Sequence, residues 1–342
     1  MVAISTHKFP KLIGISMLCT LLFACGGDKP ADNQSQTSTP ATSAVDNKSI
    51  AITSIVEHPA LDAVRQGALE ALAAEGFKEN ENLSVNFQSA QGNPATAGQI
   101  AKQFVADNPD VIIAIATPAA QAVASATTTI PVVFSAVTEP VEAKLVSKLD
   151  GSGTNITGAS DVLPLAPQID LIKELIPNVK NIGFVYSPGE VNSTVTLRNL
   201  KAITEPQGIQ IIEAPAQKSS DISMSAQSLV GKVDVIYTST DNNVINAYEA
   251  LTKVAKEAKI PLVSSDPSVV ERGASVVLGV NYHQLGIETG KITARILKGE
   301  KAGDIAIYSA KELDLMVNQD SAKEQGLQIP QSILDKAKNV VK

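Results

Sequence analysis

Short apolar runs alternate along the chain with longer segments whose apolar residues recur at helical spacing. The clearest case follows Asp110, where Val-Ile-Ile-Ala-Ile-Ala ends at Thr117-Pro118 and an Ala-rich segment begins at once. Thr is a common helix N-cap and Pro a common first helical residue. The pattern therefore predicts a buried strand followed directly by a helix that Thr117 caps.

This order of elements occurs twice. The strand and helix after Asp110 match those after Asp234, where Asp241 takes the place of the capping Thr. Each copy is preceded by a strand and an amphipathic helix, and each is followed by Ile-Pro and another apolar strand. Such alternation is typical of parallel sheets flanked by helices. We therefore predict an α/β fold of two similar Rossmann-like lobes, with the Thr117 and Asp241 loops facing a shared cleft.

The first 48 residues are not expected to belong to either lobe. Two lysines precede an apolar stretch over residues 12–23, which is too short to span a bilayer and ends at Leu-Phe-Ala-Cys25. This arrangement is typical of a bacterial lipoprotein signal. We expect residues 1–24 to be a signal peptide, Cys25 to carry lipid, and the polar residues 25–48 to be a disordered tether. The protein is then exported and lipid-anchored to a bacterial membrane.

Loop-rich segments mark where the chain crosses between the lobes and would form a multi-crossover hinge. The expected N-terminal lobe comprises residues 49–157 and about 282–305, and the expected C-terminal lobe residues 158–281 and about 306–342. The tail from residue 321 onward is predicted to be helical, with a break at Pro330.

Composition and charge exclude several functions. The formal net charge of −7 argues against a nucleic acid or an acidic membrane surface as partner. The chain has two cysteines, of which Cys19 leaves with the signal peptide, so neither a disulfide framework nor thiol catalysis is expected. The sequence also lacks a metal-ligand cluster, a phosphate loop and a nucleophile elbow. We expect no metal, no cofactor and no catalytic residue.

Polar residues at the predicted strand ends supply a candidate binding site. A free helix start at Thr117 would attract an anion, although an ordinary strand–helix turn explains the same residues. Strand-end carboxylates serve either acid–base chemistry or an ammonium ligand, and the missing nucleophile favours binding. The candidate ligand-binding residues are His58, Thr117, Pro118, Ala119, Ser135, Ala136, Asp161, Asn192, Ser193, Thr240, Asp241 and Asp266.

Several segments together resemble a known family; they are residues 68–77, 114–121, 135–141, 155–161, 238–242 and 279–286. They are similar to the tryptophan/tyrosine type of ABC-importer substrate-binding protein, which has the type I periplasmic-binding-protein fold. The resemblance implies a monomer that captures a small amino acid-like ligand, aromatic in this subgroup, and delivers it to an ABC permease. A lipid-anchored sensor without a transporter and an enzyme acting on a small molecule in the cleft are the alternatives.

This ligand class suggests a division of charges between the lobes. The helix start at Thr117–Ala119, with Ser135, would hold the α-carboxylate, and Asp266 would hold the α-ammonium group, with Asp241 or Asp161 in reserve. No residue in the sequence dictates phenylalanine, tryptophan or tyrosine.

Overall fold

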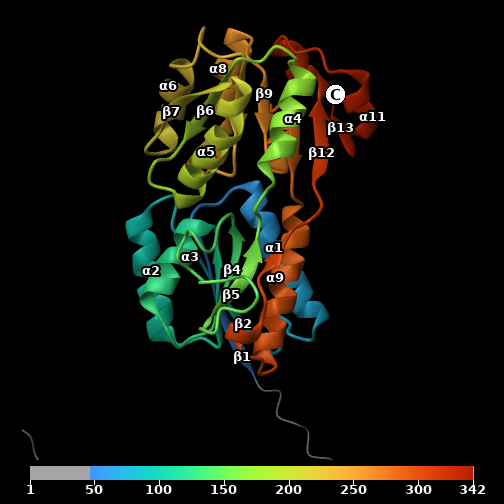
Figure 1. Ribbon diagram of the computed structural model, residues 1–342. Coiled ribbons are helices and arrows are strands. Elements are labelled where there is room, and N and C mark those ends of the chain that lie inside the picture. Colours follow the sequence, from blue (N-terminus) through green and yellow to red (C-terminus); the bar gives the residue numbers. More distant parts are fainter. Residues whose placement is uncertain (1–46, 342) are drawn as a thin grey trace, which may run out of the picture. The chain divides into compact units, whose positions relative to one another are not determined.

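The computed structural model describes residues 47–341, which form two α/β lobes (Figure 1). The expected signal peptide, Cys25 and nearly all of the expected tether lie outside the described residues. No helix in the described part of the chain combines the length and apolar character that crossing a membrane requires.

The first lobe is built on a parallel sheet with the strand order β2-β1-β3-β4-β5-β11. Its strands are β1 (Lys48–Ser54), β2 (Leu83–Ser89), β3 (Val111–Ile115), β4 (Val132–Val137), β5 (Ile156–Ser160) and β11 (Tyr308–Ser309). Its helices are α1 (Pro59–Ala74), α2 (Pro94–Asp107), α3 (Thr117–Ala126) and α9 (Tyr282–Leu297), with a short 3₁₀ turn, η4 (Ala302–Asp304). Strands β3 and β4 are buried throughout, which explains their continuous apolar sequence.

The second lobe repeats this order as β7-β6-β8-β9-β10-β12-β13, and only β12 runs antiparallel to its neighbour β10. Its strands are β6 (Asn181–Tyr186), β7 (Gln210–Pro215), β8 (Val235–Thr238), β9 (Leu262–Ser264), β10 (Val276–Gly279), β12 (Asp314–Asn318) and β13 (Asn339–Val341). Its helices are α4 (Leu165–Leu175), α5 (Val191–Thr204), α6 (Ile222–Gln227), α7 (Asn242–Asn246), α8 (Tyr248–Ala258), α10 (Gln319–Glu324) and α11 (Gln331–Lys336), with the 3₁₀ turns η1 (Glu205–Gln207), η2 (Ser219–Asp221) and η3 (Pro267–Val269). The shared order confirms the predicted pair of Rossmann-like lobes.

The chain crosses between the sheets after β5, after β10 and after β11. The first and third crossings lie a few residues later than the sequence predicts, because β5 stays beside β4 as far as Ser160 and β11 pairs with β5. The prediction of a wholly helical tail is wrong at its end, since β13 pairs with β12. The β-branched pair Val340-Val341 suits an added edge strand better than a further helical turn.

Helix α9 follows the second crossing and packs directly on α1 (Figure 1). A Cβ atom at Gly286 would lie 2.2 Å from the carbonyl oxygen of Val64, and one at Gly290 would lie 2.3 Å from that of Ala68. Only glycine permits so close an approach of two backbones. The contact fixes both His58, at the start of α1, and Tyr282, at the start of α9, relative to the first sheet.

Candidate functional site

The carboxyl ends of strands from both sheets border an enclosed cavity between the lobes, here named the central cavity. It is lined by His58, Leu61, Thr117, Ala136, Asp161, Asn192, Thr240, Asn242, Ile245, Asp266 and Tyr282. It contains about 270 Å³ of space between atoms, but the centre of a water molecule has only about 10 Å³ in which to move. A ligand as large as an amino acid therefore enters only when lobes or side chains move apart.

The structure brings together some of the predicted site residues and separates others. Those that line the central cavity are His58, Thr117, Ala136, Asp161, Asn192, Thr240 and Asp266. Those that do not are Pro118, Ala119, Ser135, Ser193 and Asp241. Ser135 was expected to assist an anion, but its hydroxyl pairs at 2.7 Å with that of Thr289 on α9 inside the first lobe.

Helix α3 begins at the central cavity, and no side chain caps its first N–H groups. Thr117 is not the N-cap that the sequence predicts, because Ala116 takes that position with a φ of 75°, and Thr117 is the first helical residue. Its hydroxyl is buried and has no hydrogen-bond partner. The backbone ladder starts with the N–H of Ala120, which donates to Ala116. The N–H groups of Thr117 and Ala119 precede it, so this helix start can receive an anion.

The matching helix start in the second lobe, at α7, is filled by the chain's own side chains. Asp241 is the N-cap, as predicted, and accepts the N–H of Val244 at 3.0 Å. It also accepts the backbone N–H of Ser187 and the Ser193 hydroxyl, both at 2.6 Å. Glu190 accepts the N–H of Asn242. Asp241 is therefore engaged within its own lobe, and the duplicated helix starts differ in charge.

Burial and the neighbouring Asp241 raise the pKa of Glu190 to about 8. The Asp241 carboxylate therefore disfavours a second negative charge on Glu190. A ligand anion is disfavoured at this side of the cavity and favoured at the α3 start.

Two buried carboxylates face the cavity from the crossing segment and from the end of β9. Asp161 accepts the Tyr282 hydroxyl at 3.0 Å through Oδ2, while its Oδ1 makes no hydrogen bond of ordinary geometry. Asp266 accepts the N–H of Ser268 at 2.8 Å and caps η3. Burial raises the pKa of both, that of Asp266 to about 6, and the charge of Asp161 adds to the rise at Asp266.

No cationic side chain among the described residues forms an ion pair with either carboxylate. Arg272 lies near enough to lower the pKa of Asp266 slightly, but its guanidinium is bound to Glu249 at 2.7 Å and to the carbonyl of Ile245. Burial lowers the pKa of His58 to about 3, so its imidazole is neutral. When these carboxyls are ionised, the cavity therefore carries negative charge that no side chain of the described residues neutralises, and a bound cation would compensate it.

Sequence reasoning missed several cavity residues. The cavity is also lined by Tyr282, Leu61, Asn242 and Ile245. Of these, only Tyr282, an aromatic residue after a predicted strand, could have been found from the sequence.

Among residues 47–341, no three His, Cys, Asp or Glu side chains lie together as metal ligands.

The comparisons with known proteins agree with this arrangement. The family model "ABC transporter substrate binding protein" matches residues 49–341. A tyrosine-binding protein of Clostridioides difficile is 36% identical over 317 residues, which are 93% of this chain and 90% of that protein. A conserved domain protein of Vibrio cholerae is 47% identical, with a TM-score of 0.85, and covers 86% of this chain and 99% of its own.

Two further solved structures are of the same type. An ABC domain from Streptococcus pneumoniae in complex with L-Trp is 34% identical, with a TM-score of 0.83, over 86% of this chain and all of that one. The ligand-free, open structure of a substrate-binding protein with adhesive properties from Clostridium difficile is 39% identical, with a TM-score of 0.65, over 86% of this chain and 99% of that one. These relatives are binding proteins rather than enzymes, and the chain belongs to the ABC transporter substrate-binding protein family.

Proposed function

We propose that this protein captures an aromatic amino acid between its lobes and delivers it to an ABC permease. The observation that carries the proposal is the charge pattern of the central cavity. Asp161 and Asp266 are buried there and form no ion pair with a side chain of the described residues, and no side chain caps the start of α3. An amino-acid zwitterion supplies both missing charges at once.

The two ends of the ligand find complementary partners. The ammonium group would donate to Asp266 and to the unpaired Oδ1 of Asp161, which are acceptors of the stronger, charge-assisted kind. The carboxylate would accept the Thr117 hydroxyl and the first N–H groups of α3, where the helix dipole favours negative charge. Asp266 is thus the ammonium partner that the sequence suggests, and Asp161 rather than Asp241 is the second partner.

The aromatic nature of the ligand is supported by the relatives. One is a tyrosine-binding protein and another was solved in complex with L-Trp, and each covers more than four fifths of this chain. Leu61 and Ile245 add apolar surface from opposite lobes to the central cavity.

Contacts across the lobes support capture by closure. The hydroxyls of Thr138 and Thr240 pair at 3.2 Å, and Arg198 donates to Glu142 at 3.1 Å. The TM-score is higher for the L-Trp complex, 0.83, than for the open ligand-free protein, 0.65, although the latter is more identical in sequence. A ligand that touches both lobes would stabilise this closed arrangement by its differential affinity.

Delivery would take place at a membrane to which a lipid on Cys25 anchors the protein. The protein would act there as a monomer. Cys25→Ser should then remove acyl labelling and release the protein from the membrane fraction. Unchanged labelling of the variant would contradict the anchor while leaving the binding function untouched.

Binding itself is tested on protein stripped by denaturation and refolding. Mass spectrometry of the released small molecules should detect an aromatic amino acid, and calorimetric titration with L-Tyr, L-Trp and L-Phe should give one site per chain. A released ligand of another class, with no heat from any of the three, would refute the proposed ligand.

A further inference from the structure

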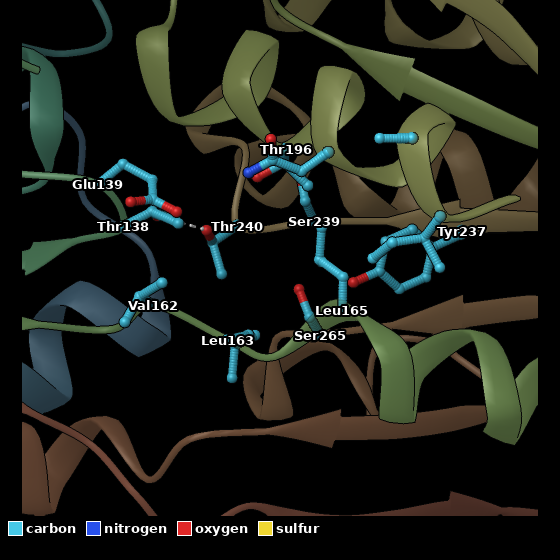
Figure 2. A pocket seen from close by; sticks show the side chains of 13 residues that line it. Thr138, Glu139, Val162, Leu163, Leu165, Thr196, Tyr237, Ser239, Thr240 and Ser265 are labelled. Carbon is cyan, nitrogen blue, oxygen red and sulfur yellow. Dashed lines mark hydrogen bonds between the residues drawn. The ribbon is translucent and has the colours of Figure 1, made fainter. Parts of the chain in front are cut away.

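A larger cavity adjoins the central cavity on the side of the first crossing, and we name it the hinge-side pocket (Figure 2). The centre of a water molecule has about 380 Å³ in which to move there, against about 10 Å³ in the central cavity. It is lined by Thr138, Glu139, Val162, Leu163, Leu165, Thr196, Asn199, Ala202, Ile203, Tyr237, Ser239, Thr240 and Ser265. These residues come from both lobes and from the crossing itself. The pocket therefore exists in this form only while the lobes are together.

The hinge-side pocket and the central cavity are neighbours. Thr240 borders both, and its hydroxyl bonds to that of Thr138 at their boundary (Figure 2). Ser265 lines the pocket, and Asp266, the next residue, lines the central cavity. A ligand whose ammonium group is held at Asp266 therefore has the pocket within reach of its side chain.

The lining combines apolar walls with two buried hydroxyls, of which that of Tyr237 has only Ser265 close by. Leu163, Leu165 and Ile203 provide apolar surface. The hydroxyls of Tyr237 and Ser239 are buried and make no hydrogen bond of ordinary geometry. Ring stacking on Phe184, with 6.2 Å between centroids, holds Tyr237 in place, and its hydroxyl is directed toward Leu165 and Ser265 (Figure 2). A buried polar group that is poorly hydrogen-bonded is costly, so both hydroxyls can gain from a ligand atom that pairs with them.

We propose that the hinge-side pocket receives the ring of the bound amino acid, and that Tyr237 and Ser239 select a ring with a hydrogen-bonding atom. A phenol hydroxyl or an indole N–H then binds better than a bare phenyl ring. This inference rests on the proposed function. The volume falls within the range of about 300–1,000 Å³ that is usual for small-molecule sites, whereas the central cavity alone cannot hold a ring.

The selectivity follows from the cost of unpaired atoms. Phenylalanine would offer neither hydroxyl a hydrogen bond, while tyrosine or tryptophan would offer one to at least one of them. A neutral hydrogen bond contributes about 0.5–1.5 kcal/mol, and 1.4 kcal/mol corresponds to about tenfold in affinity. Tyr237→Phe should therefore lower the preference for tyrosine over phenylalanine by about two- to tenfold.

The experiment is calorimetric titration of ligand-stripped wild type, Tyr237→Phe and Ser239→Ala with L-Tyr, L-Trp and L-Phe. Tyr248→Phe is the matched control, because Tyr248 is equally buried in the same lobe but pairs with Thr238 and does not line the pocket. Thermal melts of each variant verify folding. The wild type should prefer tyrosine and tryptophan, Tyr237→Phe should reduce this preference, and Tyr248→Phe should leave it unchanged.

Two outcomes would overturn the inference. One is wild-type affinity for phenylalanine within twofold of that for tyrosine; the other is a preference in Tyr237→Phe that matches the wild type within twofold, as expected if water alone pairs with the hydroxyl. In both cases the aromatic amino acids still bind, so the proposed function survives. Absence of binding by all three to the wild type would refute the proposed function as well.

Discussion

Replacing Asp266 with Asn should stabilise the ligand-free protein while weakening ligand binding. Asp266 is only 1% exposed and forms no ion pair with any residue in the described range 47–341, so its charge is costly when no ligand is bound. Asn keeps an acceptor for the N–H of Ser268, which Asp266 now caps. The substitution therefore removes the charge and little else.

The magnitude follows from the pKa of Asp266, which burial raises from 3.8 to about 6. Because each tenfold change in proton affinity corresponds to about 1.36 kcal/mol, ionising Asp266 in the folded state costs about 3 kcal/mol. Because the pKa of Asp266 is higher in the folded state than in the unfolded state, this group destabilises the fold least below pH 3.8. Its destabilising contribution then grows as the pH rises to about 6. The gain from Asn should thus approach 3 kcal/mol at pH 7 and fall to below about 1 kcal/mol at pH 4.

Binding should change in the opposite direction. Removing one member of a buried charge pair typically costs about 2–5 kcal/mol, so affinity should fall well over tenfold. Thermal melts at pH 7 and pH 4 measure stability, and calorimetric titration with L-Tyr measures affinity. Asp170→Asn, which changes an exposed carboxylate on α4, is the matched control and should alter neither. A lower melting temperature for ligand-free Asp266→Asn at pH 7, or affinity within twofold of wild type, would refute the reasoning.

Two further substitutions test the packing and the closure. Gly286→Ala places a methyl group 2.2 Å from the carbonyl oxygen of Val64 and should lower the free energy of unfolding by about 2–4 kcal/mol in denaturant titrations. Gly98→Ala, with no atom within 4 Å of the new Cβ, is the control and should have no such cost. Equal stability of the two variants would contradict the close packing of α9 on α1. Thr138→Val removes the hydrogen bond to Thr240 and should weaken L-Tyr affinity about two- to tenfold in titrations. Thr138→Ser keeps the hydroxyl and should retain most of the wild-type affinity. Equal losses of affinity in both variants would disprove the role of that bond.

Much of the fold was predictable because it depends on local pattern. Alternating apolar runs and helical segments gave both sheets, and the repeat gave the matching order of their strands. The first and third crossings were placed a few residues early, because the pairing of β5 with β4 beyond residue 157 and with β11 depends on those neighbours and not on the sequence of β5. The final strand, β13, was missed for the same reason, since its partner β12 lies some twenty residues earlier.

The candidate site was predictable in position but not in detail. Strand-end polar residues were expected at a cleft, and many line the central cavity. The sequence favoured Asp266 over Asp241 but kept Asp241 in reserve, because what separates them lies in distant segments. Ser187 and Ser193 donate to the Asp241 carboxylate, whereas the Asp266 carboxylate accepts only from the nearby Ser268. Thr117 was misassigned as a cap because the positive φ of Ala116 has no signal in an alanine.

The central claim is that the cavity binds both charges of an amino acid, and analogues that lack one charge test it most directly. Ligand-stripped protein is titrated with L-Tyr, with tyramine, which lacks the carboxylate, and with 3-(4-hydroxyphenyl)propionate, which lacks the ammonium group. The account predicts a single L-Tyr site and at least about tenfold weaker binding of both analogues. The deaminated analogue should lose little more in Asp266→Asn, because the partner of that charge is already gone. Binding of either analogue as tightly as L-Tyr would contradict the account.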